Sequence, residues 1–299
     1  MQTVLEVRAE VSHNTSVKIL QRLLTLVILL LVCLPHHGAD ADDPGGRTQP
    51  SISLRGGNPD ALTLVRIQYD SVGGMGESWY HYEGRDWQRW ETDFPRAELN
   101  LLQRLQELTS IRVNPEPISM RLTDRRLFDY PFVLMSDVGW QILSPLERKA
   151  LTRYLQEGGF LWVDDFWGDA ELDNMMNNIG SLHRDWEWKR IPDGHSILSI
   201  VYRLKACPQI PARIFFVQTG RDYDPPNVHR MPAGGWEGVS TVNFLGLFDE
   251  HGRLMAVATH NTDIADGWER EGESKEFFDR FSVKSYAMAI NVLFYAMSH

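Results

Sequence analysis

Residues 130–167 decide the fold of this chain, and they read YPFVLMSDVGW, then QILSPLERKALTRYLQEGG, then FLWVDDFW. Residues 131–135 form an almost unbroken apolar run, which is typical of a strand covered on both faces, and residues 160–163 form a second one. Between them, Ser144 and Glu147 have the spacing of a capping box at the start of a helix. A strand, a helix and a strand joined this closely predict a right-handed parallel crossover.

The helix of this unit is predicted to pack on the sheet through one apolar stripe. The stripe comprises Leu146, Ala150, Leu151, Tyr154 and Leu155. Gly158 follows the stripe, and glycine commonly ends helices because it adopts the left-handed conformation at little cost.

Strands and helices alternate along the rest of the folded region. Apolar or alternating runs predict strands within residues 61–69, 113–122, 185–191, 212–217, 239–247 and 254–259. Helical spacing predicts helices at residues 97–109, 170–182 and 275–297. In the first of these, the expected inward side chains are Leu99, Leu102, Leu105 and Leu108. The glycine- and aromatic-rich residues 70–95 are predicted to be a long functional loop. This alternation predicts an α/β fold with a mostly parallel central sheet.

Composition excludes several classes of protein. The formal net charge of −10 argues against nucleic-acid binding, which needs a basic face to displace counterions. The two cysteines, Cys33 and Cys207, provide neither a disulfide framework nor a cysteine-rich metal site. The apolar content of 43% is enough for a large core.

The N-terminal residues 1–41 have the layout of a secretory signal peptide. Lys18 and Arg22 precede an apolar run, and Ala39-Asp40-Ala41 fits a small-x-small cleavage pattern. The alternative is an uncleaved membrane anchor formed by residues 18–34, although the apolar run is short for a spanning helix. Either reading places the folded part outside the cytoplasm, as a periplasmic or secreted domain.

Two further segments complete the expected domain organisation. Residues 42–60 are rich in glycine, proline, serine and aspartate, which predicts a flexible linker. Residues 61–299 are predicted to form a single α/β domain.

Acidic residues follow the predicted core strands. In parallel sheets ligands bind beyond the carboxyl ends of the strands, a rule that selects Asp137, Asp164, Asp165 and Trp167. Side chains of neighbouring strand residues diverge, so one of Asp164 and Asp165 is expected to face the site while the other caps a loop. Two close carboxylates suit a divalent metal ion or an acid/base pair. The structural alternative is that one of the two aspartates caps a backbone group while the other pairs with an arginine.

Two histidines are further candidates. His195, within Pro-Asp-Gly-His-Ser, has a side chain suited to metal ligation or proton transfer near neutral pH. It is expected to form a mixed site with Asp164 or Asp165, and the alternative is a histidine that holds a loop through hydrogen bonds. His260 ends another predicted strand and is a candidate for the same rim.

Five aromatic side chains crowd residues 70–95, namely Trp79, Tyr80, Tyr82, Trp87 and Trp90. Exposed aromatic rings stack on sugar faces or anchor protein partners, which predicts a glycan or protein partner. The alternative is that these rings cover the edge of the sheet as part of the core.

The run FVLMSDVGWQILSPLERKALTRYLQEGGFLWVDDFWG, followed by Pro192-Asp193-Gly194-His195, resembles the family catalogued as domain of unknown function 4159. The resemblance covers residues 62–298 and implies a fold similar to the class I glutamine amidotransferase domain, a flavodoxin-like three-layer sandwich. It brings no catalytic residues. An amidotransferase needs a cysteine on a sharp strand-to-helix elbow, and Cys207 in KACPQIP has no such setting.

Two functions from different classes follow from these observations. The leading hypothesis is an exported, amidotransferase-like domain that lacks the cysteine nucleophile and acts as a ligand-binding or assembly module. The alternative is a metal-assisted hydrolase in which Asp164, Asp165 and His195 hold a cation that activates a water molecule. A membrane-tethered scaffold, which requires an uncleaved N-terminus, is a third hypothesis.

Overall fold

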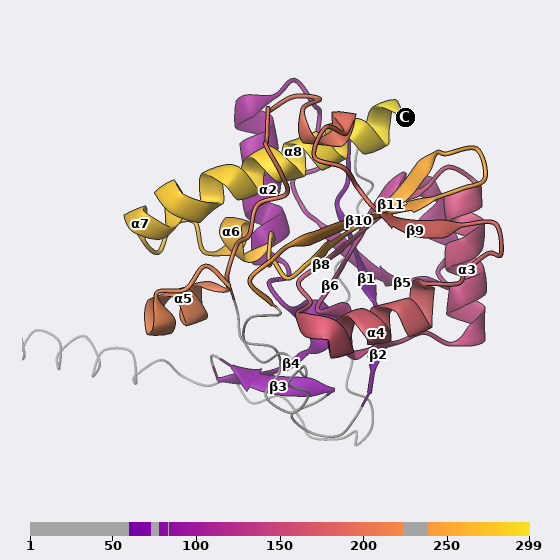
Figure 1. Cartoon of the computed structure of the whole chain (residues 1–299), viewed down its shortest axis with the longest axis horizontal. Helices are drawn as coiled ribbons and strands as arrows, with labels where there is room; N and C mark the ends of the chain where they lie inside the picture. Colours follow the sequence, from indigo (N-terminus) through magenta and orange to yellow (C-terminus); the bar gives the residue numbers. More distant parts are fainter. Residues whose placement is uncertain (1–59, 73–77, 83, 224–238) are drawn as a thin grey trace, which may run out of the picture. The chain divides into compact units, whose positions relative to one another are not determined.

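The structure is a computed structural model that describes residues 60–72, 78–82, 84–223 and 239–299. A seven-stranded sheet lies at its centre, with the order β5-β1-β6-β8-β11-β10-β9 (Figure 1). These strands are β5 (Ile118–Arg121), β1 (Val65–Gln68), β6 (Phe132–Ser136), β8 (Phe160–Asp164), β11 (Leu254–His260), β10 (Asn243–Phe248) and β9 (Glu187–Arg190). The first five are parallel, whereas β10 is antiparallel to both of its neighbours. Counted along the chain, the parallel strands have the flavodoxin-like order 2-1-3-4-5.

The central crossover, β6–α3–β8, has the predicted architecture. Strands β6 and β8 pair in parallel from Phe132↔Phe160 to Ser136↔Asp164. Helix α3 (Pro145–Gln156) begins with the predicted capping box, in which the Ser144 N–H donates to the Glu147 carboxylate at 3.0 Å. The left-handed conformation predicted for Gly158 is confirmed by its φ of 101°.

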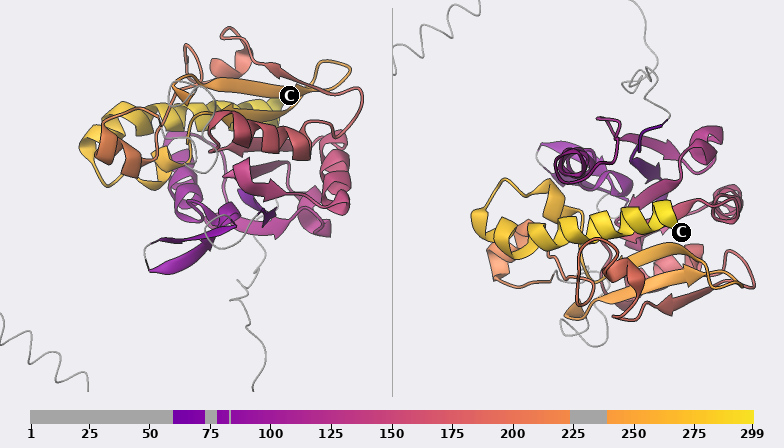
Figure 2. Two further views of the ribbon diagram at one scale, coloured as in Figure 1. Left: turned by 60° about the horizontal axis from the view of Figure 1, so that its bottom comes forward. Right: turned by 90° about the horizontal axis from the view of Figure 1, so that it is seen from above.

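Helices cover both faces of the sheet, as the two further views show (Figure 2). On one face, α2 (Arg96–Leu108) and α8 (Val283–Ser298) pack against Leu134 and Trp162. On the other, α3 and α4 (Gly168–Ile179) pack against Val133 and Val163. Successive strand residues therefore enter opposite cores, as the pleat requires. The predicted α/β three-layer sandwich is confirmed.

Two predicted apolar stripes are partly wrong. In α3, Leu146 is 71% exposed while Leu155 is fully buried, because a separation of nine residues places the two on opposite sides of a helix. In α2, Leu99 and Leu108 are exposed, since a spacing of three residues drifts around the helix. The buried side of α2 comprises Ala97, Glu98, Leu101, Leu102 and Leu105.

The prediction of a strand at residues 212–217 is wrong. The chain here forms helix α5 (Arg213–Thr219), which ends at Gly220 with a φ of 67°. The Arg213 N–H donates to the Asp266 carboxylate, which satisfies one of the free amide groups at the start of the helix. A short apolar run does not distinguish a strand from a helix by periodicity, and only Phe216 of α5 is buried.

Residues 70–95 contain more regular structure than the predicted loop. Strand β2 (Asp70–Ser71) pairs with β7 (Gln141–Ile142), and β3 (Trp79–Tyr82) forms a hairpin with β4 (Arg85–Gln88). The aromatic side chains of this segment therefore project from a small two-stranded sheet and from the following turn η1 (Arg89–Glu91).

The remaining elements are short, except for the C-terminal helical stretch. They are η2 (Arg125–Asp129), η3 (Val138–Trp140), η4 (Ser196–Leu198), α6 (Asp266–Glu269), α7 (Lys275–Phe277) and the π-helical turn η7 (Phe278–Ser282). Elements α7, η7 and α8 follow one another without a gap, which confirms the helix predicted at residues 275–297. Within the described ranges, no helix is both long and apolar enough to cross a membrane.

The N-terminal predictions fall outside the described residues. The signal peptide or anchor at residues 1–41 and nearly all of the linker at 42–60 belong to residues 1–59, which the structure does not describe. They stay predictions.

Candidate functional site

A cavity of about 660 Å³ lies at the carboxyl edge of the sheet. Its lining includes Asp137, Asp165 and Asp263, which follow β6, β8 and β11 in the chain. The hairpin β3–β4 and helix α5 contribute further lining residues. Cavities of this volume hold small-molecule ligands in many proteins, and the position agrees with the rule for parallel sheets.

Asp164 and Asp165 diverge at the end of β8. Asp164 is fully buried and accepts hydrogen bonds from the Thr259 hydroxyl and from the Ala265 N–H. Burial raises the pKa of Asp164 to about 6. Asp165 has a φ of 55°, lines the cavity and accepts a hydrogen bond from the Trp167 indole N–H at 3.0 Å. Asp164 therefore has a structural role, and Asp165 is the member of the pair that faces the cavity.

Asp137 lies on the same rim, at the end of β6. Its carboxylate forms an ion pair with Arg89 at 3.1 Å and accepts a hydrogen bond from the Thr92 hydroxyl at 3.3 Å. Burial raises the pKa of Asp137 to about 6, and the Arg89 guanidinium opposes that rise. The backbone of Asp137 has a φ of 54°, and its carbonyl accepts from the Tyr69 hydroxyl at 2.8 Å.

Trp167 connects this rim to helix α4. Trp167 is 6% exposed and lines the cavity. Its backbone N–H donates to the Glu171 carboxylate at 2.6 Å, which caps the first turn of α4 with a negative charge. Trp167 thus has little freedom to rotate.

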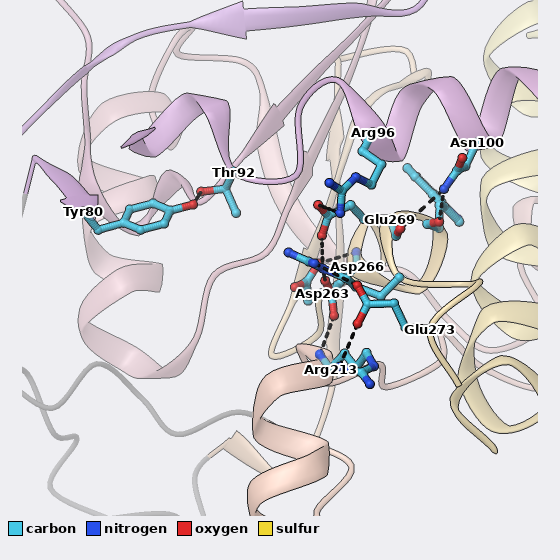
Figure 3. Close-up of polar contacts among 11 residues, drawn as sticks. Tyr80, Thr92, Arg96, Asn100, Arg213, Asp263, Asp266, Glu269 and Glu273 are labelled. Carbon is cyan, nitrogen blue, oxygen red and sulfur yellow. Dashed lines mark hydrogen bonds and ion pairs between the residues drawn. The ribbon is translucent and has the colours of Figure 1, made fainter. Parts of the chain in front are cut away.

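A cluster of five carboxylates at the cavity was not predicted. One oxygen of each of Asp93, Asp266 and Glu269 lies within 4.8 Å of the others, and the same holds for Asp93, Asp165 and Asp263. We call these five residues the carboxylate cluster. Figure 3 shows Asp263, Asp266 and Glu269 close together, with Arg213 and Arg96 beside them. Such a group of oxygens is chemically able to hold a divalent metal ion or an organic cation.

Burial and mutual repulsion govern the protonation of the carboxylate cluster. Both effects raise the pKa of Asp93 and of Asp263 well above the usual range. Burial and the charge of Glu269 raise the pKa of Asp266 to about 7. Since buried like charges are unfavourable, this part of the cavity favours either protons or a bound cation.

Three arginines partly neutralise the acidic side chains of the cavity. Arg213 binds Glu273 at 2.7 Å, and Arg270 binds Glu273 at 2.9 Å and also pairs with Glu269. Arg89 pairs with Asp137. These ion pairs fix the directions of several carboxylates and leave donors and acceptors side by side.

Three of the five predicted aromatic residues line the cavity, namely Tyr80, Tyr82 and Trp87. Tyr80 donates to or accepts from the Thr92 hydroxyl at 3.1 Å, and the Trp87 indole N–H donates to the Tyr82 carbonyl at 2.9 Å. Trp79 is half-buried and does not line the cavity, whereas Trp90 belongs to the core as the structural alternative expected.

A family model for a domain of unknown function (DUF4159) matches residues 64–297. The chain belongs to this family. The match extends over the sheet, its covering helices and the cavity. A search of curated proteins found no match.

In this DUF4159 domain, His195 does not join the aspartates, so the predicted mixed site is wrong. Its ring lies 5.6 Å from the ring of Tyr295 and 6.5 Å from that of Phe248. Phe248 pairs with Leu254 at the amino end of β11, so His195 lies at the edge of the sheet opposite the cavity. Its Nδ1 accepts from the Ile197 N–H at 3.3 Å, which is the loop-holding role given above as the alternative.

His260 ends β11 on the cavity side, but its ring is buried beneath the rim. Its Nε2 hydrogen-bonds the Gly168 carbonyl at 3.0 Å, and its Nδ1 lies 3.0 Å from the Asn243 side-chain amide. Burial lowers the pKa of His260 to about 4, so the ring is neutral near pH 7. His260 therefore holds the start of α4 against β11 and is not among the cavity-lining residues.

Cys207 lacks the surroundings of a nucleophile. It lies in an irregular segment between η4 and α5, where its thiol is half-buried and 3.8 Å from the Pro208 carbonyl oxygen. Burial raises the pKa of the Cys207 thiol, whereas a cysteine nucleophile needs a lowered pKa.

Sequence reasoning missed four members of the carboxylate cluster, Asp93, Asp263, Asp266 and Glu269. Asp263 follows β11 by three residues, so the strand-end rule applied to Asp137 and Asp165 would also have selected it. Asp93 carried no such signal, because it reaches the cavity only through the path of the chain after the hairpin.

Proposed function

We propose that this protein is an exported carbohydrate-binding domain whose sugar ligand occupies the cavity at the carboxyl edge of the sheet. One observation carries the proposal: aromatic side chains and carboxylates line the same cavity of about 660 Å³. Sugars present an apolar face of C–H groups and an edge of hydroxyl groups, so their binding sites combine aromatic rings with charged hydrogen-bonding groups.

The cavity has both kinds of group in fixed positions. Tyr80, Tyr82 and Trp87 line it and are partly exposed, so their rings are accessible to a ligand. The pairs Arg89–Asp137 and Arg213–Glu273 hold donors and acceptors beside each other, and adjacent hydroxyl groups of a sugar bind such pairs well. Ion pairing holds these side chains in place before a ligand binds, so little further ordering is needed on binding, which favours affinity.

The signal-like residues 1–41 support the exported part of the proposal. The setting of Cys207 supports a binding role over amidotransferase catalysis, because a buried thiol of raised pKa is a poor nucleophile. Together they favour a binding module that works outside the cytoplasm.

A glycan array followed by isothermal titration calorimetry tests this function. We expect a mono- or disaccharide to bind, and Trp87→Ala to weaken its binding at least about tenfold, which corresponds to about 1.4 kcal/mol. Trp79→Ala is the matched control, since Trp79 lies on the same hairpin but does not line the cavity. Equal affinity in the two variants, or no sugar bound by the intact protein, would contradict the proposal.

A second candidate function is metal-assisted hydrolysis, and the five converging carboxylates favour it. Asp165 remains a candidate ligand, joined by Asp93 and Asp263. Asp164 is bound to Thr259 and Ala265, and His195 lies at the edge of the sheet opposite the cavity. A stoichiometric metal ion in purified protein that Asp165→Asn removes, together with hydrolysis that requires it, would favour this function over sugar binding alone.

A further inference from the structure

The lining of the cavity is unevenly charged. Among the described residues, eight carboxyl groups and three guanidinium groups line it. The guanidinium groups of Arg89, Arg213 and Arg270 are bound to Asp137, Glu273 and Glu269. Within the described part of the chain, no lysine or arginine lies within ion-pair distance of Asp93 or Asp263. The negative charge at these two residues has no direct counter-charge from the protein.

Asp263 is the more enclosed of the two. It is 3% exposed, and its Oδ1 accepts the Asp266 N–H at 2.9 Å. No described residue hydrogen-bonds its second oxygen. This oxygen is accessible to solvent, so its hydrogen-bond partner comes from water or from a ligand. Since Asp263 lines the cavity, a ligand is the natural source of that partner.

Asp93 also has a carboxylate oxygen without a hydrogen-bond donor from the described residues. Its Oδ2 is inaccessible to solvent and has no hydrogen-bond partner among the described residues. The nearest compensating charge is that of Arg66, but this guanidinium is bound to Glu98 at 2.7 Å and acts on Asp93 only from a distance. A buried acceptor without a donor is unfavourable, so a ligand donor placed here would be strongly favoured.

We infer that the sugar bound in this cavity carries a protonated amino group, which lies among Asp93, Asp165 and Asp263. This inference rests on the proposed function. The three acceptor oxygens lie within 4.8 Å of one another. Even if all three separations were at the 4.8 Å limit, a nitrogen equidistant from the oxygens would be about 2.8 Å from each, which is the length of a charge-assisted N–H···O bond. An alkylammonium group has three N–H donors, one for each carboxylate.

An amino sugar fits the cavity better than a divalent ion alone. A metal ion would occupy one corner of a cavity of about 660 Å³ and would leave the partly exposed rings of Tyr82 and Trp87 without a contact. An amino sugar places its ring against those aromatic side chains while its ammonium group reaches the carboxylates. The surplus of carboxylates also selects against anionic sugars, because like charges repel strongly where water is excluded.

Calorimetric titrations with glucosamine, glucose and N-acetylglucosamine test the inference. We expect glucosamine to bind at least tenfold more tightly than the two neutral sugars. Asp263→Asn should abolish most of this preference, because an asparagine still accepts the Asp266 N–H but removes the charge. Asp93→Asn should act in the same way, and the exposed Asp173→Asn is the matched control.

The outcomes separate this inference from the proposed function. If glucose and glucosamine bind equally and Trp87→Ala weakens both, the inference is wrong and sugar binding stands. If none of the sugars on the array or in solution binds, both are wrong. Binding that requires added calcium or magnesium and is lost on chelation would also overturn the inference, since the cation would then be a metal ion.

Discussion

Asp93 belongs to both carboxylate triads, so its carboxylate is repelled by several acidic neighbours. Replacing it with asparagine keeps the size of the side chain and removes a buried negative charge beside Asp266 and Glu269. We predict that Asp93→Asn stabilises the protein by about 1 kcal/mol or more, because each unit of raised pKa corresponds to 1.36 kcal/mol. Urea unfolding measures the change, and a destabilised variant would show that this carboxylate has a partner that balances its charge.

The pH dependence of stability follows from the same residues. Burial and the neighbouring charges raise the pKa of Asp266 to about 7 in the folded state, and they raise those of Asp93 and Asp263 well above the usual range. The unfolded chain has already lost these protons near neutral pH, so it binds fewer protons than the native state and stability falls as the pH rises. His260 has the opposite effect, but only below about pH 6.5, where the unfolded histidine gains its proton.

We therefore predict a loss of stability between about pH 6.5 and 8, on the order of 1 kcal/mol. The loss should be smaller in Asp93→Asn, because that variant has one fewer shifted carboxyl group. Thermal unfolding across this range measures it. A stability that rises with pH in the intact protein would show that these carboxylates are ionised in the fold at neutral pH.

The two neighbours at the end of β8 provide a test of their assigned roles. Asp164→Asn replaces one acceptor with a donor beside the Thr259 hydroxyl or the Ala265 N–H, so we predict a destabilisation of about 1–3 kcal/mol. Asp165→Asn should not destabilise the protein, since asparagine tolerates the left-handed conformation, still accepts from the Trp167 indole and removes a charge that repels Asp93 and Asp263. Urea unfolding measures both changes. A larger destabilisation by Asp165→Asn than by Asp164→Asn would contradict the assignment of Asp164 as the structural residue and Asp165 as the cavity residue.

At the scale of elements, the turn between α3 and β8 depends on two glycines for different reasons. A Cβ at Gly159 would lie 2.3 Å from the Tyr154 ring, whereas a Cβ at Gly158 meets nothing but would be strained by the φ of 101°. We predict that Gly159→Ala costs about 1–3 kcal/mol through overpacking and that Gly158→Ala costs about 1–2 kcal/mol through backbone strain. Chemical denaturation distinguishes them, since Gly159→Ala should also disturb the near-ultraviolet signal of Tyr154.

Elements with strong local signals were predictable from the sequence. The capping box at Ser144 and the buried runs of β6 and β8 specify their own conformation, so the central crossover was predicted in detail. Helix α5 was missed because its seven residues have no decisive period. Its conformation is set by contacts that come from elsewhere, chiefly the Asp266 carboxylate at its first amide group. The exposed Leu99 shows that leucine spacing alone does not identify the buried side of a helix.

At the scale of the whole molecule, the sequence indicated the edge of the sheet that carries the site but not all of its members. Asp137, Asp165 and Trp167 follow strands whose carboxyl ends meet at that edge, so topology placed them. Tyr80 reaches the same cavity from the hairpin β3–β4 and Asp93 from the turn after η1, and only the tertiary fold brings them there. His195 was misplaced because the sequence does not tell which edge of the sheet its loop returns to.

The whole fold, combined with the setting of Cys207, predicts that the protein does not hydrolyse glutamine. A raised pKa leaves almost no thiolate near pH 7, and no described histidine hydrogen-bonds the sulfur. We expect Cys207→Ser to leave ligand binding unchanged within about twofold. Release of ammonia from glutamine that Cys207→Ser abolishes would contradict this assignment.

The most direct test of the central claim is the ¹H–¹⁵N spectrum of the tryptophan indole groups during a titration with glucosamine. Trp87, Trp140 and Trp167 line the cavity, whereas Trp162 and Trp268 lie in the core and act as internal controls. We predict that the indole signals of the three cavity residues shift in a saturable manner while those of the two core residues stay in place. Saturable binding that leaves the three cavity signals unmoved, or no binding at all, would contradict the account.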